Sequence, residues 1–231
     1  MRTLGLIGGM SWLSTRTYFE KINTLVQRRT TPRTTAPLII DSVDFSALLG
    51  LKDGSDWDAA TDQLVASAKR VESAGAEGLV ICANSMHRDF ARIADAVDIP
   101  ILHAADCIGE KAVKDGKTNV ALIGRRNLMT ESFFRQRIVA HGVDLMPPDM
   151  ANVELVDKII YEELMAGKVS RDAERAFKTI ITQKEQAGAT GIILACTELE
   201  LVIDVNANVL PIFDSANIHC EAAVEWMFET E

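Results

Sequence analysis

The sequence lacks the features of membrane and nucleic-acid proteins. No apolar run reaches the ~20 residues that a membrane-spanning helix needs, and the first residues lead into a strand-like segment with no signal-peptide pattern. The 24 Lys and Arg residues are outnumbered by 33 Asp and Glu residues, for a formal net charge of -9. A nucleic-acid surface would need a basic stripe. We therefore expect a cytoplasmic protein with no membrane and no nucleic-acid partner.

The sequence also lacks the spacings of common metal, disulfide and nicotinamide sites. Its four cysteines contain no C-x-x-C pair and no nearby pair of histidines, so we expect free thiols and no metal site. Residues 8–11 (GGMS) supply only half of the G-x-G-x-x-G fingerprint, so a nicotinamide cofactor is not expected. The cysteines are Cys82, Cys107, Cys196 and Cys220.

An internal repeat is the most informative feature that is present. Residues 74–84 (AGAEGLVICAN) return 113 positions later (188 − 75) as residues 187–197 (AGATGIILACT). Each copy has a glycine suited to ending a helix, then an apolar run typical of a buried parallel strand, then small polar residues. Cys196 aligns with Ala83, and Cys82 should face the opposite way because neighbours along a strand alternate. The repeat predicts a symmetric scaffold with an asymmetric site.

Two further matches extend the repeat over the chain. Residues 5–8 (GLIG) match 121–124 (ALIG), and residues 99–106 match 210–217. Because strands alternate with helical patterns, we predict an α/β protein with two pseudo-symmetric, doubly wound parallel-sheet domains and the active site between them. The predicted domains are 1–98 plus 210–231, and 99–209.

Helical periodicity adds five predicted helices. Asp56 and Ser170 are placed to act as N-caps. The predicted helices are 15–28, 57–73, 130–141, 153–166 and 170–186.

Ligands of open parallel sheets bind beyond the carboxyl ends of the strands. A thiol between such a strand end and a helix has its pKa lowered by the helix N-terminus, which favours Cys196 as a reactive thiol over a buried, inert cysteine. The glycines of residues 8–11 let backbone N–H groups approach an anion such as a carboxylate. The predicted strand ends are residues 8–11, 84–85, 124–125 and 196–197, and the hydroxyls near the first belong to Ser11, Ser14 and Thr15.

The chain resembles the aspartate/glutamate racemases that work without pyridoxal phosphate. The resemblance rests on residues 8–12 (GGMSW), 41–45 (DSVDF), 84–87 (NSMH) and 195–198 (ACTE), and it covers essentially the whole chain. It implies that no cofactor is used, that the protein is a homodimer, and that the substrate is a small molecule, either an amino acid or a dicarboxylate. In this family two cysteines, one from each domain, flank the substrate Cα, one removing a proton and the other donating one.

The resemblance places Cys196 as the base on the L-face and Ala83 at the position of the missing second acid or base. Water, Ser85, His87 or Cys82 are the alternatives left for that second role. The family's G-T-x-x-T turn is replaced by residues 124–128 (GRRNL), so both threonines that would hold a carboxylate are absent. The implied substrate-binding residues are Met10, Ser11, Lys52, Asn84, Ser85, Lys168, Thr197 and Glu198.

Several of these roles have a plain structural alternative. Asn84, Ser85 and Thr197 belong to residue types that also end strands for local reasons. Lys52 and Lys168 resemble the family's contacts to a distal carboxylate, but lysines on such loops are usually solvated. His219 either orients groups near the site or is a structural histidine.

Three functions remain open from the sequence. The first is an amino-acid racemase with an impaired, one-base or engineered site, in which Ala83 is either natural or introduced. The second is a single-cysteine decarboxylase or isomerase of the same superfamily, acting on substituted malonates. The third is a non-catalytic protein that binds small carboxylates.

Overall fold

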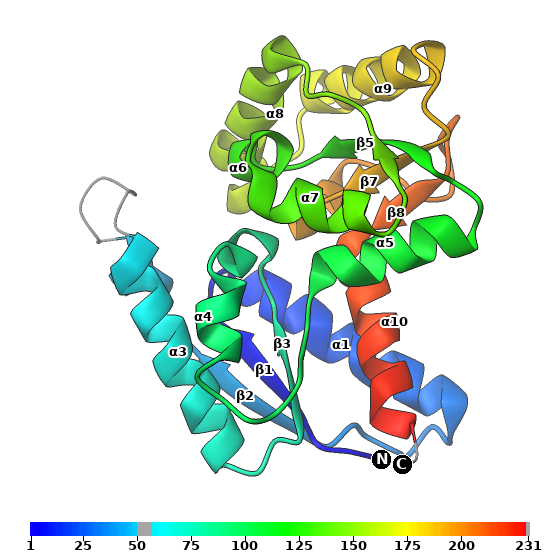
Figure 1. The fold of residues 1–231 in the computed structure, drawn as a ribbon. Coiled ribbons are helices and arrows are strands. Elements are labelled where there is room, and N and C mark those ends of the chain that lie inside the picture. The colour runs from blue at the N-terminus through cyan, green and yellow to red at the C-terminus, as the bar shows by residue number, and fades with distance from the viewer. Residues whose placement is uncertain (50–56, 230–231) are drawn as a thin grey trace. The chain divides into compact units, whose positions relative to one another are not determined.

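The computed structural model describes residues 1–49 and 57–229. It contains two compact units, Met1–His103 with His219–Glu231, and Ala104–Ile218, and each is described by itself (Figure 1). Within the described residues, no helix combines the length and apolar character needed to cross a membrane.

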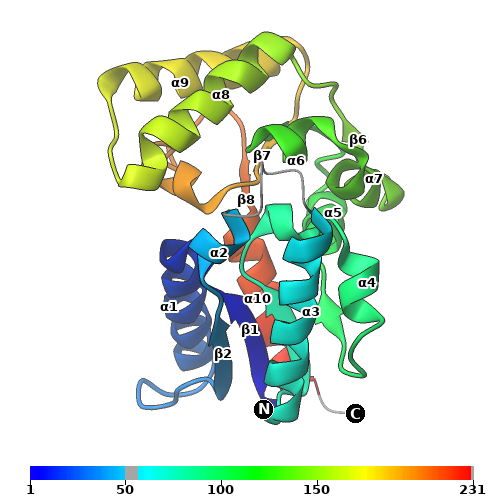
Figure 2. The same ribbon diagram turned by 90° about the vertical axis from the view of Figure 1, so that its left-hand side faces the viewer.

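Unit 1 is built on a four-stranded parallel sheet in the order β2-β1-β3-β4. Helices α3 and α4 cover one face of this sheet, and α1 and α10 cover the other (Figure 2). Its strands are β1 (Leu4–Gly8), β2 (Leu38–Ser42), β3 (Gly78–Ile81) and β4 (Ile101–Leu102). Its helices are α1 (Trp12–Arg29), α2 (Phe45–Leu49), α3 (Trp57–Ser73), the 3-10 turn η2 (Asn84–His87), α4 (Phe90–Ala94) and most of α10 (Ser215–Phe228).

Unit 2 repeats this plan with the strand order β6-β5-β7-β8, again all parallel. Helices α8 and α9 lie on one face of the sheet, and α5 and α7 lie on the other (Figures 1 and 2). Its strands are β5 (Asn119–Ile123), β6 (Asp144–Leu145), β7 (Gly191–Leu194) and β8 (Ile212–Asp214). Its helices are α5 (Ala104–Lys114), α6 (Arg126–Thr130), α7 (Ser132–Ala140), α8 (Met150–Glu162), η3 (Leu164–Ala166), α9 (Arg171–Gln186) and η4 (Thr197–Leu201).

The predicted α/β class with two parallel sheets is confirmed, and the two sheets match strand for strand. The unit boundaries lie later in the chain than the predicted ones, after His103 and after Ile218. The reason is strand pairing, since β4 pairs with β3 and β8 pairs with β7. The repeated segments at 99–106 and 210–217 therefore supply the last strand of each sheet, and the crossing to the other unit follows that strand.

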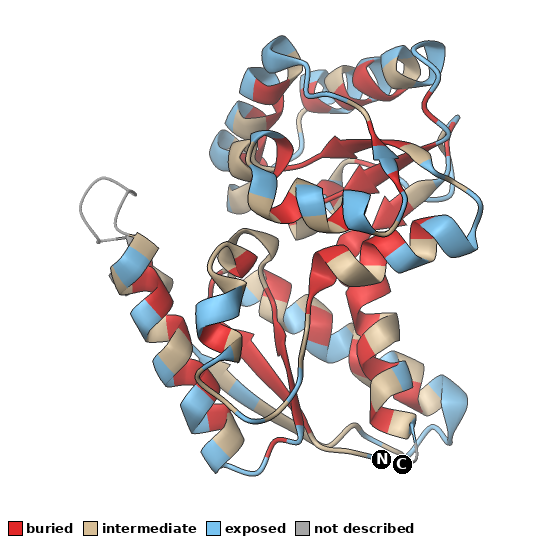
Figure 3. Cartoon of the chain, in the orientation of Figure 1, coloured by how far each residue is buried: buried red, intermediate tan, exposed pale blue. Residues whose placement is uncertain are grey.

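The central strands of both sheets are buried, as expected for strands covered on both faces (Figure 3). Glycines let the covering helices of unit 1 approach closely. A Cβ on Gly5 would lie 2.1 Å from a methyl of Val71 on α3, and a Cβ on Gly78 would lie 2.4 Å from the ring of Trp226 on α10. Each glycine therefore makes room for a side chain of a covering helix, one on each face of the sheet.

The predicted helices 57–73 and 170–186 match α3 (Trp57–Ser73) and α9 (Arg171–Gln186) closely. The Oγ atom of Ser170 accepts a hydrogen bond from the N–H of Ala173 (3.0 Å), so Ser170 is the N-cap of α9 as predicted. The helix predicted over 130–141 is α7 (Ser132–Ala140), which begins two residues later than predicted because Glu131 is extended. Helix α8 begins earlier than predicted because Asp149 caps it. Asp56 lies outside the described residues.

Candidate active site

Cys196 lies just beyond the carboxyl end of β7. It is the N-cap residue of η4, with φ −148° and ψ 130°. In unit 1, Ala83 is the N-cap residue of η2, with φ −153° and ψ 116°. The last paired residues of the two sheets, Ile7 with Ile81 and Ile123 with Leu194, place both positions two residues beyond a matching pair. Ala83 and Cys196 are therefore structurally equivalent, as the sequence repeat predicts.

The strand order of unit 2 marks the ends of β5 and β7 as the place for a ligand. In the order β6-β5-β7-β8 the winding reverses between β5 and β7, and open parallel sheets bind ligands beyond the strand ends at such a point. The segments that follow β5 and β7 are still in contact there, because a Cβ on Gly124 would lie 3.0 Å from the Cβ of Ala195. Arg125 follows Gly124 and Cys196 follows Ala195, so the backbones of these two residues lie side by side.

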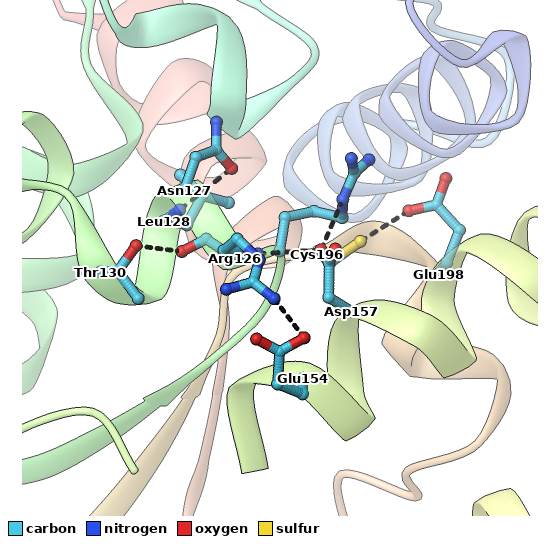
Figure 4. Close-up of polar contacts among 9 residues, drawn as sticks. Arg126, Asn127, Leu128, Thr130, Glu154, Asp157, Cys196 and Glu198 are labelled. Atoms are coloured by element: carbon cyan, nitrogen blue, oxygen red, sulfur yellow. Dashed lines mark hydrogen bonds and ion pairs between the residues drawn. The ribbon is translucent and has the colours of Figure 1, made fainter. Parts of the chain in front are cut away.

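The Cys196 thiol faces a carboxylate. Its Sγ atom donates a hydrogen bond to Glu198 Oε2 (2.9 Å) (Figure 4). Thr197 Oγ1 donates to the same oxygen (2.9 Å). Burial raises the pKa of the Cys196 thiol well above its ordinary value, the negative charge of Glu198 raises it further, and the positive charge of Arg125 partly opposes this rise. The predicted lowering of this pKa is therefore wrong. Desolvation and a nearby carboxylate outweigh the field of η4, which is only five residues long.

Arg125 is held by two residues of α8. Its Nε atom donates to Asp157 Oδ1 (3.2 Å), and its guanidinium carbon lies 3.6 Å from the ring centroid of Tyr161. The same Asp157 oxygen accepts the backbone N–H of Arg126 (2.9 Å), whose side chain pairs with Glu154 (Figure 4). Sequence reasoning missed Asp157 and Tyr161. A polar residue at 157, directly after buried Val156, was the available signal.

The hydroxyls expected to bind an anion in unit 1 are engaged in the turn itself. Ser11 Oγ accepts the N–H of Ser14 (3.4 Å) and so caps α1. Thr15 Oγ1 accepts the N–H of Gly9 (2.8 Å) and donates to the carbonyl of Ser11 (3.1 Å). Met10 is buried in the core. These contacts give Ser11 and Thr15 a structural role in joining β1 to α1.

The backbone conformation at position 9 requires a glycine. The φ of Gly9 is +86°, and an added Cβ would lie 2.0 Å from the carbonyl oxygen of Val43. The equivalent position at the end of β5 holds Arg125. The two turns therefore differ in what they can present, since the first accepts no side chain.

The end of β3 carries small, uncharged side chains. Asn84 and Ser85 lie on η2 and are half-buried, as is Ala83. Cys82 is buried, and burial raises the pKa of its thiol. The alternation between buried Cys82 and the more accessible Ala83 agrees with the strand pattern predicted from the sequence.

Three of the four histidines of the chain gather in the interior of unit 1. Tyr18 Oη lies 2.9 Å from Nδ1 of His219, and Nε2 of His219 donates to the carbonyl of Leu102 (3.1 Å). Burial lowers the pKa of His219 to about 4, so it is neutral at pH 7. His219 is therefore a structural histidine. His87 and His103 lie beside it, with ring centroids 4.5 Å apart, and the described residues contain no group of His, Cys, Asp or Glu that could hold a metal ion.

The two lysines expected near a distal carboxylate are placed differently. Lys52 lies outside the described residues. Lys168 is exposed and follows Gly167, whose φ of +68° ends η3. Because η3 packs against η4, Lys168 lies close in the chain to an element that touches the Cys196 segment.

Comparison with known proteins identifies the family. The model of the Asp/Glu/hydantoin racemase family matches residues 7–223, and the chain belongs to that family. A Yersinia pestis protein of known structure, named as a candidate Asp/Glu racemase, is 36% identical, with a TM-score of 0.93 over 99% of this chain and 100% of the other. An aspartate racemase homologue from Pyrococcus horikoshii is 31% identical over 99% of this chain and 100% of its own, with a TM-score of 0.86.

A more distant likeness concerns the fold alone. An arylmalonate decarboxylase is 14% identical over 99% of this chain and 94% of its own, with a TM-score of 0.54.

Proposed function

We propose that this protein is a cofactor-independent amino-acid racemase of the aspartate/glutamate class in which unit 2 supplies the one acid/base thiol, Cys196. The observation that carries the proposal is the pair of equivalent positions, which hold Cys196 in one unit and Ala83 in the other. Membership of the Asp/Glu/hydantoin racemase family supports the reaction class. The homodimer and the cytoplasmic location expected from the sequence stay predictions.

In the proposed reaction Glu198 first takes the proton of Cys196. The S–H bond breaks, an O–H bond forms on the carboxyl group, and a thiolate is left. The 2.9 Å contact between Cys196 Sγ and Glu198 Oε2 supports this transfer. Because the pKa of the thiol is raised, the thiolate is scarce at neutral pH and correspondingly basic.

The thiolate then removes the Cα proton of an L-amino acid. The C–H bond breaks, an S–H bond forms, and the electron pair moves into the carboxylate to give an enediolate. Return of the proton from the same thiol regenerates the L-isomer, whereas inversion needs a donor on the other face. A methyl group at position 83 cannot donate, so we expect exchange of the Cα proton to be faster than inversion.

The proposal is tested by proton NMR of L-aspartate and L-glutamate incubated with the protein in deuterated water. Loss of the Cα proton signal would support it. The absence of exchange with both amino acids would contradict it and favour a different substrate or a protein that only binds carboxylates.

A second candidate is the decarboxylation of a disubstituted malonate. One thiol is sufficient to protonate the enediolate that follows loss of carbon dioxide, so Ala83 favours this reaction as well. A parallel sample would contain a disubstituted malonate in place of the amino acid. Release of carbon dioxide that is lost in Cys196→Ser, without Cα exchange in the amino acids, would favour the decarboxylase.

A further inference from the structure

The side chain of Arg125 has donors to spare beside the reactive thiol. Its printed contacts use the Nε atom, which donates to Asp157, and the flat face of the guanidinium, which lies on the ring of Tyr161. Within residues 1–49 and 57–229, its two terminal nitrogens have no hydrogen-bond partner. A guanidinium fixed through Nε and one face presents its two terminal amino groups together, which is the geometry that binds a carboxylate through two hydrogen bonds.

The surroundings of Arg125 favour a strong contact of this kind. The side chains of Arg125 and Asp157 are 22% and 20% exposed, so water competes less for the guanidinium than at an open surface. Asp157 also accepts the backbone N–H of Arg126, so its position is fixed from two directions. An arginine held in place in advance loses less conformational entropy when a ligand binds.

Arg125 and Cys196 also present their side chains on the same side of the sheet. Each follows a paired strand by two residues, after Ile123 and Leu194, and both are extended, with ψ values of 151° and 130°. Alternation along extended chains therefore turns the two side chains to one face. The positive charge of Arg125 is close enough to act on the ionisation of Cys196.

We propose that Arg125 is the residue that binds the α-carboxylate of the substrate and stabilises the enediolate formed when Cys196 removes the Cα proton. The proposal rests on the proposed function for its chemistry. The α-carboxylate is bonded directly to Cα, so it must lie close to the thiol that removes the Cα proton. When the Cα electron pair moves into this group its negative charge increases, and a charged, forked donor binds it more strongly than before.

The proposal places a charged carboxylate-binding residue in the turn at residues 124–128. At this turn the resemblance to the family implies two threonines, which are absent here. An arginine reaches further than a threonine and carries a full positive charge. We therefore expect the affinity to depend strongly on the carboxylate at Cα.

The test compares ligands with and without the α-carboxylate. L-glutamate and 4-aminobutyrate share an amine and a distal carboxylate, and they differ in the carboxylate at Cα. Binding of both is measured by calorimetry to the unaltered protein, Arg125→Gln, Arg125→Lys and Arg126→Gln. Arg126 is a matched control, because it is the adjacent arginine and its side chain pairs with Glu154.

We expect Arg125→Gln to weaken the binding of L-glutamate roughly 10- to 100-fold, the range of a charge-assisted hydrogen-bond pair. The same change should alter 4-aminobutyrate by no more than about twofold, and Arg126→Gln should spare both ligands. Arg125→Lys should recover part of the L-glutamate affinity, since it keeps the charge and loses the fork. In deuterated water, Arg125→Gln should slow Cα exchange by more than it weakens binding. The reason is that the enediolate loses more stabilisation than the bound substrate does.

Equal weakening of the two ligands by Arg125→Gln, or unchanged binding of L-glutamate, would overturn the assignment. So would a failure of the unaltered protein to bind L-glutamate more tightly than 4-aminobutyrate. Circular dichroism of each variant identifies a loss of fold, and Arg125→Lys keeps the comparison available if Arg125→Gln unfolds. Failure of the racemase proposal has a different signature, namely selective, Arg125-dependent binding of L-glutamate with no Cα exchange.

Discussion

The two units share one strand order and end their equivalent strands with different chemistry. In unit 1 the turn after β1 carries Gly9, which accepts no side chain, and the turn after β3 carries Ala83. In unit 2 the same two turns carry Arg125 and Cys196. The backbone around the two N-cap positions differs by about 14° at most, so the scaffold was kept while the ionisable side chains were concentrated in one unit.

Removing the thiol should have the largest effect on this comparison. Cys196→Ala should reduce Cα exchange by at least ~10³-fold, because the proposed base is lost. Cys107→Ala is the control within the same unit, where burial raises the pKa of Cys107 to about 12 and no reactive role is proposed. The rates are measured by proton NMR in deuterated water. Equal rates in Cys196→Ala and the unaltered protein would exclude the thiol as the base.

Adding a thiol to unit 1 should make the two units alike. Ala83→Cys places a thiol at a position with nearly the backbone angles of Cys196, so we expect formation of the D-isomer to increase by about 100-fold or more. Ala83→Ser is the matched control, with a similar size and a hydroxyl that is a far weaker acid. Chiral chromatography measures both products. A folded Ala83→Cys variant that forms no more D-isomer than Ala83→Ser would show that position 83 is not the second acid/base site.

Acid should weaken unit 1 through its buried histidine. The folded pKa of His219 is about 4, below its ordinary 6.5, so the unfolded chain binds a proton more readily between these values. The contribution of His219 to the stability of the folded state is complete above pH 6.5 and is lost as the pH falls towards 4. The difference of about 2.5 between the two pKa values corresponds to roughly 3 kcal/mol of unfolding free energy.

Tryptophan fluorescence can follow this loss, since Trp12, Trp57 and Trp226 all belong to unit 1. The urea midpoint of the unaltered protein should decrease between pH 7 and pH 4.5. His219→Asn should have a lower midpoint at pH 7 and a smaller decrease with acid, and His141→Asn, in unit 2, should retain the decrease. The same pH dependence in His219→Asn as in the unaltered protein would exclude His219 as its source.

Glu198 should affect the thiol of unit 2 in two opposite ways. Glu198→Gln removes the negative charge that raises the pKa of Cys196, so at pH 8 the thiolate fraction and the rate of alkylation by iodoacetamide should increase by about tenfold. The same variant should exchange Cα protons more slowly, because the thiol has lost its proton acceptor. Glu200→Gln changes a carboxylate of the same short helix and serves as the control. Faster alkylation together with unchanged exchange would exclude Glu198 as the acceptor.

The repeat in the sequence was sufficient to predict the fold and the most important equivalence. Apolar strand runs after helix-ending glycines predicted the parallel sheets, and the spacing of 113 residues aligned Ala83 with Cys196. The ends of elements and units were predicted less well. Because Glu131 is extended, α7 begins two residues later than predicted, and the pairing of β4 and β8 places the unit boundaries later in the chain.

The electrostatics of the site could not be predicted from local sequence. The rise in the pKa of Cys196 depends on its burial and on the direction in which the Glu198 side chain points. The placement of Arg125 depends on Asp157 and Tyr161, which are more than 30 residues away in the chain. The hydroxyls of Ser11 and Thr15 had the right type for an anion site, and the fold uses them inside the turn.

The ratio of Cα exchange to inversion in the unaltered protein tests the central claim most directly. One sample of L-aspartate or L-glutamate in deuterated water is followed by proton NMR for loss of the Cα signal and by chiral chromatography for the D-isomer. A single thiol in unit 2 predicts exchange that is much faster than formation of the D-isomer. Equal rates of exchange and inversion would contradict this account, because they require an efficient second acid/base group that Ala83 cannot supply.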